Sequence, residues 1–221
     1  MIELTRDGDV HLITMTAQPN TVQPDFLDAM HGALDEVDAA CTGAGALVLT
    51  GTGKSFNVGL DVPVVTSLEG DAARRFSTGI MRLMKRLLVG PVPTVAALNG
   101  HAFAAGAFLA LACDFRVMRS DRGWFCVSEV DVGVPIGAPM MTVLRAKLPP
   151  HVASRAVLTG HRYTGEEALA DHIVDAIAGE SELLDVARER AAMLGSKERD
   201  ILHELKRTLW YEVGEALGPR A

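Results

Sequence analysis

The stretch LVLTGTGKSFNVGLD, residues 47–61, is an apolar run followed by a glycine-containing loop. Its Gly53-Lys54-Ser55 matches the end of a phosphate-binding P-loop, but that motif requires a glycine five residues earlier, where this chain has Val48. The residues after Lys54 are also poor helix formers, whereas a P-loop lysine opens a helix whose N-terminus faces phosphate. The loop is therefore not expected to hold a nucleoside triphosphate.

Composition narrows the class of protein. The 221 residues are 48% hydrophobic and 22% charged, which predicts one globular core rather than a disordered chain. Acidic residues outnumber basic ones 28 to 21, and this argues against a nucleic-acid surface, which needs clustered Lys and Arg. Cys41, Cys113 and Cys126 lack the spacing of a zinc site or a disulfide framework, so we expect reduced core thiols and no metal.

The sequence predicts no contact with a membrane. Its longest apolar run, residues 102–113, is too short to cross a bilayer and is typical of a buried helix. The first 16 residues lack the basic start and long apolar core of a secretory signal, and they predict a strand pair that turns at residues 7–9. We therefore expect a cytoplasmic protein.

Strand and helix patterns alternate along the chain. Phe26, Met30, Leu34 and Val37 recur at helical spacing and mark one face of a helix over residues 24–40. Further strands are predicted at 10–16, 46–50, 92–100 and 113–120, and further helices at 71–89, 104–112, 139–147, 150–159, 180–194 and 197–217. A capping box, Thr164 to Glu167, opens one more helix. This is an α/β pattern, with a core over 1–195 and a helical C-terminal extension over 196–221.

A second loop, NGHAFAAGAF at residues 99–108, also follows an apolar strand and runs straight into a helix. Backbone N–H groups at a helix N-terminus can bind developing negative charge. The small residues also have an ordinary explanation, because Gly and Ala allow a helix to pack closely against a sheet. This loop taken alone leaves both interpretations open.

The two loops together resemble the crotonase (enoyl-CoA hydratase/isomerase) superfamily. Its pattern is F-x-x-G-x-D, then N-G-x-A-x-G/A-x-G, then C-D and a strand that bears a glutamate. The matching residues are Phe56, Gly59, Asp61, Asn99, Gly100, Ala102, Ala104 to Gly106, Cys113, Asp114 and Glu129. The resemblance implies a crotonase-like (ClpP/crotonase) spiral of ββα units.

The resemblance also implies a site for an acyl-CoA thioester. The backbone N–H groups of Leu60 and Ala105 would form an oxyanion hole for the thioester carbonyl, because fixed donors are effective where enolate charge develops. The substrate-binding positions implied by the family pattern are Phe56, Val58, Gly59, Asp61 and Phe108. No separate cofactor is implied, since coenzyme A is part of the substrate.

The position of carboxylates separates the reactions of this superfamily. Hydratases typically carry two glutamates, because water addition needs both oxygen activation and proton transfer. This chain has Phe108 at the first position and Glu129 at the second. One carboxylate is sufficient for a 1,3-proton shift, so the resemblance favours a Δ3,Δ2-enoyl-CoA isomerase. A hydratase or other crotonase reaction is the alternative, and a non-catalytic acyl-CoA-binding protein is a third.

Other charged residues remain candidates. On a strand, Asp131 would share a face with Glu129 and could be an auxiliary acid or a structural cap. Residues 14–25 lack the Arg or Lys that many family members use to bind coenzyme A phosphates. Lys54, Lys206 and Arg207 are possible substitutes.

The C-terminal helix carries an apolar stripe. Leu202, Leu205, Leu209 and Val213 follow one another at spacings of 3, 4 and 4 residues, so they share one helical face that must be covered. In the family that the chain resembles, such helices pack at trimer interfaces. The expected assembly is a homotrimer or a dimer of trimers.

Overall fold

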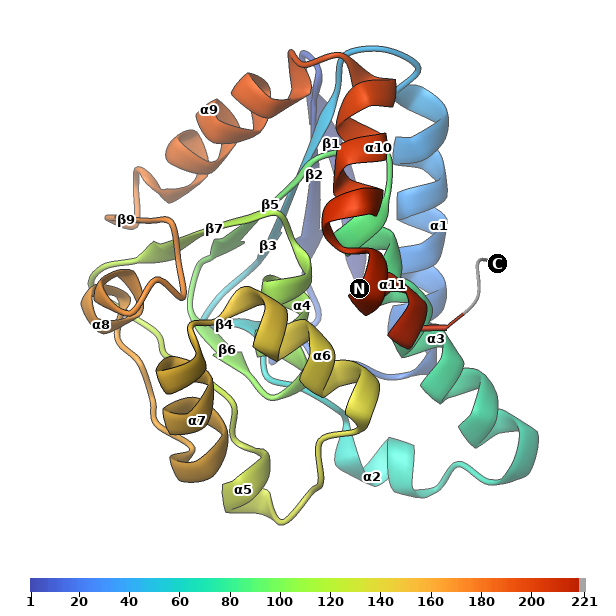
Figure 1. The fold of residues 1–221 in the computed structure, drawn as a ribbon, viewed down its shortest axis with the longest axis vertical. Helices are drawn as coiled ribbons and strands as arrows, with labels where there is room; N and C mark the ends of the chain where they lie inside the picture. The colour runs from blue at the N-terminus through green and yellow to red at the C-terminus, as the bar shows by residue number, and fades with distance from the viewer. Residues whose placement is uncertain (219–221) are drawn as a thin grey trace.

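The chain folds into two sheets enclosed by helices, as the computed structural model of residues 1–218 describes (Figure 1). The larger sheet has the order β1-β2-β3-β5-β7-β9, and the smaller one has the order β4-β6-β8. The strands of the two sheets are β1 (Ile2–Asp7), β2 (Val10–Met15), β3 (Ala46–Gly51), β4 (Ser55–Asn57), β5 (Thr94–Leu98), β6 (His101–Phe103), β7 (Phe115–Arg119), β8 (Phe125–Cys126) and β9 (Ala176–Ala178). Its helices are α1 (Pro24–Ala40), α2 (Val62–Thr66), α3 (Gly70–Val89), α4 (Ala105–Ala112), α5 (Glu129–Val132), α6 (Ala138–Lys147), α7 (Pro150–Thr159), α8 (Gly165–Ala170), α9 (Leu183–Gly195), α10 (Arg199–Leu209) and α11 (Tyr211–Ala216).

Three successive turns of the chain repeat one arrangement. Each turn places a strand in the larger sheet, the next strand in the smaller sheet, and then a helical segment: β3-β4-α2-α3, β5-β6-α4 and β7-β8-α5. The neighbouring strands of these turns are parallel, whereas the β1–β2 hairpin is antiparallel. The predicted α/β spiral of ββα units is therefore confirmed.

The larger sheet is covered on both faces. Val48, Val95 and Val117 pack against α9 on one face, and Leu49, Leu98 and their neighbours pack against α1, α3 and α4 on the other. Figure 1 shows α9 on one side of the sheet and α1, α3 and α10 on the other. Burial on both faces explains why the sequence of residues 46–49 is apolar throughout instead of alternating.

The longer predicted elements are confirmed and the shortest ones were missed. Helices 24–40 and 150–159, the strand pair that turns at 7–9, and the capping box of Thr164 with Glu167 lie where the sequence predicts them. Strands β4 and β6 lie within segments read as loops, because three residues are too few to show a strand pattern.

The C-terminal segment differs from the single helix predicted over 197–217. It breaks at Trp210 into α10 and α11, which contact α3 and α6. The predicted apolar stripe is split, since Val213 is buried whereas Leu205 and Leu209 are exposed on the surface of this chain. Residues 219–221 of the predicted extension lie outside the described residues.

Lys206 fastens α10 to the core. Its Nζ donates to Asp114 Oδ2 at 2.7 Å and to two backbone carbonyl oxygens, those of Leu87 and Val92, at 3.3 and 3.2 Å. The side chain is only 5% exposed and that of Asp114 12%. This ion pair therefore joins the C-terminal helices to the start of the third ββα turn.

We predict that Lys206→Met lowers the free energy of unfolding by about 3–5 kcal/mol, because removing one partner of a buried pair leaves the other charge uncompensated. Urea unfolding followed by circular dichroism measures the change. Arg207→Met is the matched control, since Arg207 is partly exposed and lies 3.6 Å from exposed Glu204. Its loss should cost about 0–1 kcal/mol. Equal effects of the two substitutions would contradict the assignment of Lys206 as an anchor.

Candidate active site

Two backbone segments meet where β4 and β6 end. Gly59, after β4, has φ +95, and a Cβ there would lie 2.9 Å from Ala104 Cβ and 3.4 Å from the backbone N of Ala105. Gly106, in the first turn of α4, lies so close to Asn57 that a Cβ would be 2.1 Å from its carbonyl oxygen. Such contacts exclude any side chain, so glycine at both positions is what allows the two segments to touch.

The N–H of Leu60 is presented away from the fold. The carbonyl oxygen of Gly59, in the same peptide unit, accepts a hydrogen bond from the N–H of Val22 at 2.8 Å. Because a trans peptide directs its C=O and N–H to opposite sides, the N–H of Leu60 points away from Val22. Within residues 1–218 this N–H has no acceptor.

The N–H of Ala105 is oriented in the same manner. The carbonyl oxygen of Ala104 accepts from the N–H groups of Ala107 and Phe108, so it points along α4 and the Ala105 N–H points out of the helix start. Ala104 adopts φ 49 and ψ −122, a region that non-glycine residues rarely occupy and that costs about 1–3 kcal/mol. No acceptor for the Ala105 N–H lies within the described chain. Free N–H groups at a helix N-terminus attract negative charge.

Glu129 follows β8, the strand that pairs with β6, and comes three residues after the pairing of Phe103 with Cys126. The expectation that Glu129 is itself on a strand is wrong: β8 ends at Cys126, and Glu129 is the first residue of the short helix α5. Its Oε2 is buried without a hydrogen-bond partner among the described residues. Burial raises the pKa of this carboxyl above its ordinary value, and its own backbone N–H partly offsets the rise. Such a carboxylate is suited to accept a proton.

Asp131 does not share a face with Glu129. Two residues on a helix are about 200° apart around the axis, whereas on a strand they would be on the same side. Asp131 is exposed and lies against Gly160 at the end of α7. The interpretation of Asp131 as an auxiliary acid beside Glu129 is therefore wrong.

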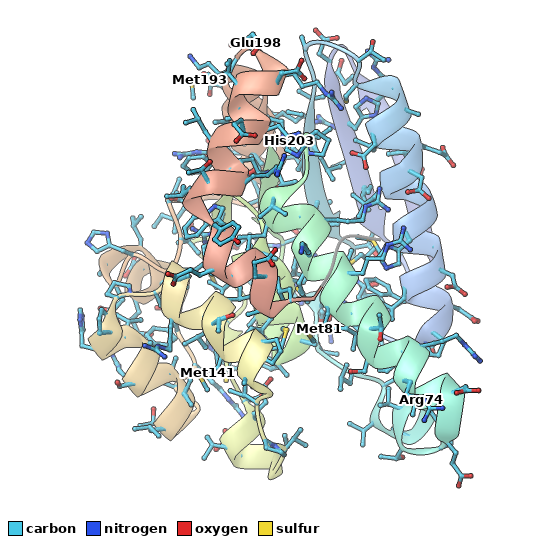
Figure 2. All side chains as sticks on the ribbon, turned by 45° about the vertical axis from the view of Figure 1, so that its right-hand side comes forward. Arg74, Met81, Met141, Met193, Glu198 and His203 are labelled. Carbon is cyan, nitrogen blue, oxygen red and sulfur yellow. The ribbon has the colours of Figure 1, made fainter. Side chains whose placement is uncertain are left out.

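Helix α4, which begins at Ala105, is apolar and packed between two other helices. Phe108 lies one helical turn after Ala105 and is 2% exposed, at the position where hydratases of the superfamily carry a glutamate. Helix α4 is flanked by α3 and α6, and Met81 and Met141 of these two helices are partly buried against the core (Figure 2). Position 108 is therefore occupied by a buried apolar side chain rather than by an ionisable one.

The remaining predicted site residues differ in exposure. Phe56 is fully buried in the core, whereas Val58 is half-buried next to Gly59. Asp61 caps α2, since its Oδ1 accepts from the N–H of Val64 at 3.3 Å and its Oδ2 accepts from Thr21 Oγ1 at 3.4 Å. These contacts show that Asp61 braces the loop. Contact of any of these residues with a substrate stays a prediction.

The suggested phosphate-binding residues lie in different environments. Lys206 is excluded as a phosphate ligand because its buried ammonium already donates to Asp114 and to two carbonyl oxygens. Arg207 lines a groove of about 700 Å³ between α1, α3, α10 and α11, to which His203 also contributes from α10 (Figure 2). None of the predicted catalytic or substrate-binding residues lines that groove. Lys54 is exposed on the loop before β4.

Two buried asparagines support the site and were missed in the sequence. Asn20 donates from Nδ2 to the carbonyl oxygens of Ser55 and Phe56, at 3.1 and 3.2 Å. Asn57 Oδ1 accepts from the N–H of Gly59 at 2.9 Å. The Asn-x-Gly spacing of the second could have signalled a side-chain turn, but nothing in the sequence connects Asn20 with β4.

No helix of residues 1–218 combines the length and apolar character that crossing a bilayer requires. The same residues contain no group of three or more His, Cys, Asp or Glu side chains arranged around a common point where a metal could bind.

The raised pKa of Glu129 predicts a pH-dependent effect on stability. Because the folded carboxyl holds its proton more tightly than the unfolded one, folding is penalised once pH rises through the folded pKa. We therefore expect Glu129→Gln to increase the free energy of unfolding at pH 7, with the gain disappearing below the ordinary pKa of glutamate. Urea unfolding at a series of pH values measures it. A variant that is equally stabilised at every pH would show that ionisation is not the cause.

Comparisons with known proteins agree with this geometry. The family model "Enoyl-CoA hydratase/isomerase" matches residues 5–218. Enoyl-CoA delta isomerase 3 of Arabidopsis thaliana is 36% identical over 186 residues, which cover 82% of this chain and 78% of the relative. A putative enoyl-CoA hydratase of Thermus thermophilus is 37% identical over 175 residues, covering 78% and 68%.

The same similarity extends to solved structures. A probable enoyl-CoA hydratase of Mycobacterium tuberculosis superposes with a TM-score of 0.91 at 28% identity, over 98% of this chain and 91% of that one. The match along nearly the whole length, with plant delta isomerases among the relatives, means that the chain belongs to the enoyl-CoA hydratase/isomerase family of the crotonase superfamily, on its isomerase branch.

Proposed function

We propose that this protein is a Δ3,Δ2-enoyl-CoA isomerase. The observation that carries the proposal is the pairing of one buried, unpartnered carboxylate, Glu129, with the apolar Phe108 at the position where hydratases have their other acid. A 1,3-proton shift needs one group that takes up a proton and returns it, and it needs no second acid.

The reaction would proceed through a dienolate. The N–H groups of Leu60 and Ala105 donate to the thioester carbonyl oxygen of a 3-enoyl-CoA, while the Glu129 carboxylate removes a proton from C2. The electron pair of the C2–H bond passes into the carbonyl, and the oxygen takes up negative charge that the two donors stabilise. Glu129 then returns the proton to C4, the double bond moves to C2–C3, and the carboxylate is regenerated.

Burial supports the two halves of this mechanism. A carboxylate with a raised pKa is a stronger base toward C2, and apolar neighbours limit the water that could compete for the dienolate. The name of the Arabidopsis relative is that of an isomerase, while that of the Thermus relative is that of a hydratase. Phe108 favours isomerase activity over hydratase activity, because its ring supplies neither a proton nor a base for water addition.

We predict that Glu129→Gln lowers isomerase turnover by about 10²–10⁴-fold, the contribution of a positioned acid–base group, and leaves substrate binding largely unchanged. Product analysis with 3-enoyl-CoA and 2-enoyl-CoA of several chain lengths measures isomerisation and hydration side by side. Circular dichroism provides the control for folding.

Three outcomes would contradict the proposal. A variant that keeps most of its isomerase rate would remove Glu129 from the role of base. A wild-type protein that hydrates 2-enoyl-CoA as fast as it isomerises 3-enoyl-CoA would overturn the argument from Phe108. Binding of both thioesters without turnover would instead identify a non-catalytic acyl-CoA-binding protein.

We further propose that the protein assembles as a homotrimer or a dimer of trimers. Ile201, Leu205 and Leu209 are each more than 60% exposed and follow one another at four-residue intervals on α10, so they form an apolar stripe that another surface would cover. We expect light scattering at micromolar concentration to give three or six times the mass of one 23.6 kDa chain. A monomeric mass would contradict this assembly.

A further inference from the structure

Asn57 lies where the two candidate donor segments touch. It is fully buried, it ends β4, and its carbonyl oxygen is in direct backbone contact with Gly106 of α4. Its side-chain Oδ1 accepts the N–H of Gly59 at 2.9 Å, and its Nδ2 makes only a long contact of 3.8 Å with Met15 Sδ. The principal polar contact of this side chain is therefore with the turn that leads to Leu60.

Gly59 cannot define the orientation of that turn by itself. A glycine with φ +95 has no side chain to restrict its backbone, so the orientation of its two peptide units depends on outside contacts. Val22 N–H holds the carbonyl oxygen of Gly59, and Asn57 Oδ1 holds the N–H. Together these two contacts fix the peptide units on both sides of Gly59.

The contact with Asn57 also determines which N–H is free. Gly59 and Leu60 present two consecutive backbone N–H groups, and Asn57 occupies the first. Without that acceptor, the buried N–H of Gly59 would be left unpaired, and the turn would lower its energy by rotating toward another acceptor. Such a rotation changes φ of Gly59, which has no side chain to resist the change, and a change in φ displaces the following peptide unit that carries the Leu60 N–H.

We propose that Asn57 is a positioning residue for the thioester reaction. Its amide oxygen fixes the Gly59 turn so that the Leu60 N–H is aimed at the carbonyl oxygen of the bound thioester. This inference rests on the proposed function, in which Leu60 and Ala105 donate to that oxygen. The requirement is for a short side-chain acceptor at position 57, not for an asparagine as such.

The test compares Asn57→Ala, which removes the acceptor, with Asn57→Ser, which keeps a short side-chain oxygen able to reach the N–H two residues later. Thr50→Val is the matched control. It also removes one buried hydrogen bond between a side chain and the backbone, that of Thr50 Oγ1 to the carbonyl oxygen of Ala97 at 2.8 Å, but this bond lies in the larger sheet. Melting curves should show a similar loss of stability for Asn57→Ala and Thr50→Val.

Two measurements separate positioning from folding. The first is kcat against KM for 3-enoyl-CoA, and the second is the infrared stretching frequency of the thioester carbonyl in bound acyl-CoA, which falls as donors polarise it. We expect Asn57→Ala to lower kcat by roughly 10- to 100-fold with KM nearly unchanged, because misaligning a donor by about 1 Å weakens transition-state stabilisation. The bound carbonyl frequency should return toward its value in water. Asn57→Ser should restore both, and Thr50→Val should change neither.

The carbonyl frequency also distinguishes this inference from the proposed function, because it needs binding but no turnover. A wild-type protein that polarises the carbonyl without isomerising the substrate would refute the proposed isomerase activity. The carbonyl frequency of the Asn57 variants would still show whether Asn57 positions the donor. An Asn57→Ala variant with wild-type frequency and kcat would overturn the positioning role. So would a wild-type protein that binds acyl-CoA without any shift of the carbonyl band, or an Asn57→Ser variant as impaired as Asn57→Ala.

Discussion

The close contact between the backbones of β4 and β6 is the constraint on which the rest of the site depends. At Gly100 a Cβ would lie 2.1 Å from the carbonyl oxygen of Lys54, and at Gly106 it would lie equally close to that of Asn57. These distances are far below van der Waals contact, so each position accepts only a hydrogen. Because the two strands approach this closely, the segments that follow them bring Gly59, the residue before Leu60, against the backbone of Ala104 and Ala105.

Lys206 and Glu129 are two partly or fully buried charged side chains with opposite surroundings. At Lys206 the ammonium is surrounded by a carboxylate and two carbonyl oxygens, which offset the loss of water. At Glu129 one carboxylate oxygen is buried with no partner within residues 1–218. The first arrangement stabilises the docking of the C-terminal helices. The second leaves a carboxylate oxygen without a partner, and burial raises the pKa of its carboxyl above the ordinary value.

The sequence was informative where the pattern was long or where glycine had a specific use. Helix 24–40 was predicted from its apolar spacing, and the segments that contain Leu60 and Ala105 were found from the glycines that allow them to touch. Strands β4 and β6 could not be predicted, since they are held by contacts between segments about 45 residues apart rather than by their own three residues. The burial of Lys206 was also hidden, because Asp114, its partner, is 92 residues away in the chain.

The environment of Glu129 illustrates the same limit. Counting positions from the family pattern singled out Glu129, but the pattern placed this residue on a strand. The predicted direction of the Asp131 side chain was therefore wrong, because both residues lie in a helix. The ladder between β6 and β8 ends at Cys126, and local geometry after that point is determined by α5 and its left-handed end at Gly133. Such a change from strand to helix over three residues leaves no periodic signal.

The shortness of α5 has a consequence for how the site can change. The turn before Leu60 and the start of α4 at Ala105 are in direct backbone contact, whereas Glu129 begins a helix of four residues in which Val130, Asp131 and Val132 are all exposed. A segment with few buried contacts opens at a lower free energy than the sheets beside it. The contact between Gly59 and the start of α4 and the segment that carries Glu129 therefore belong to separate cooperative units. Insertions or substitutions in residues 129–137 can change the surroundings of Glu129 while the fold and that backbone contact remain intact.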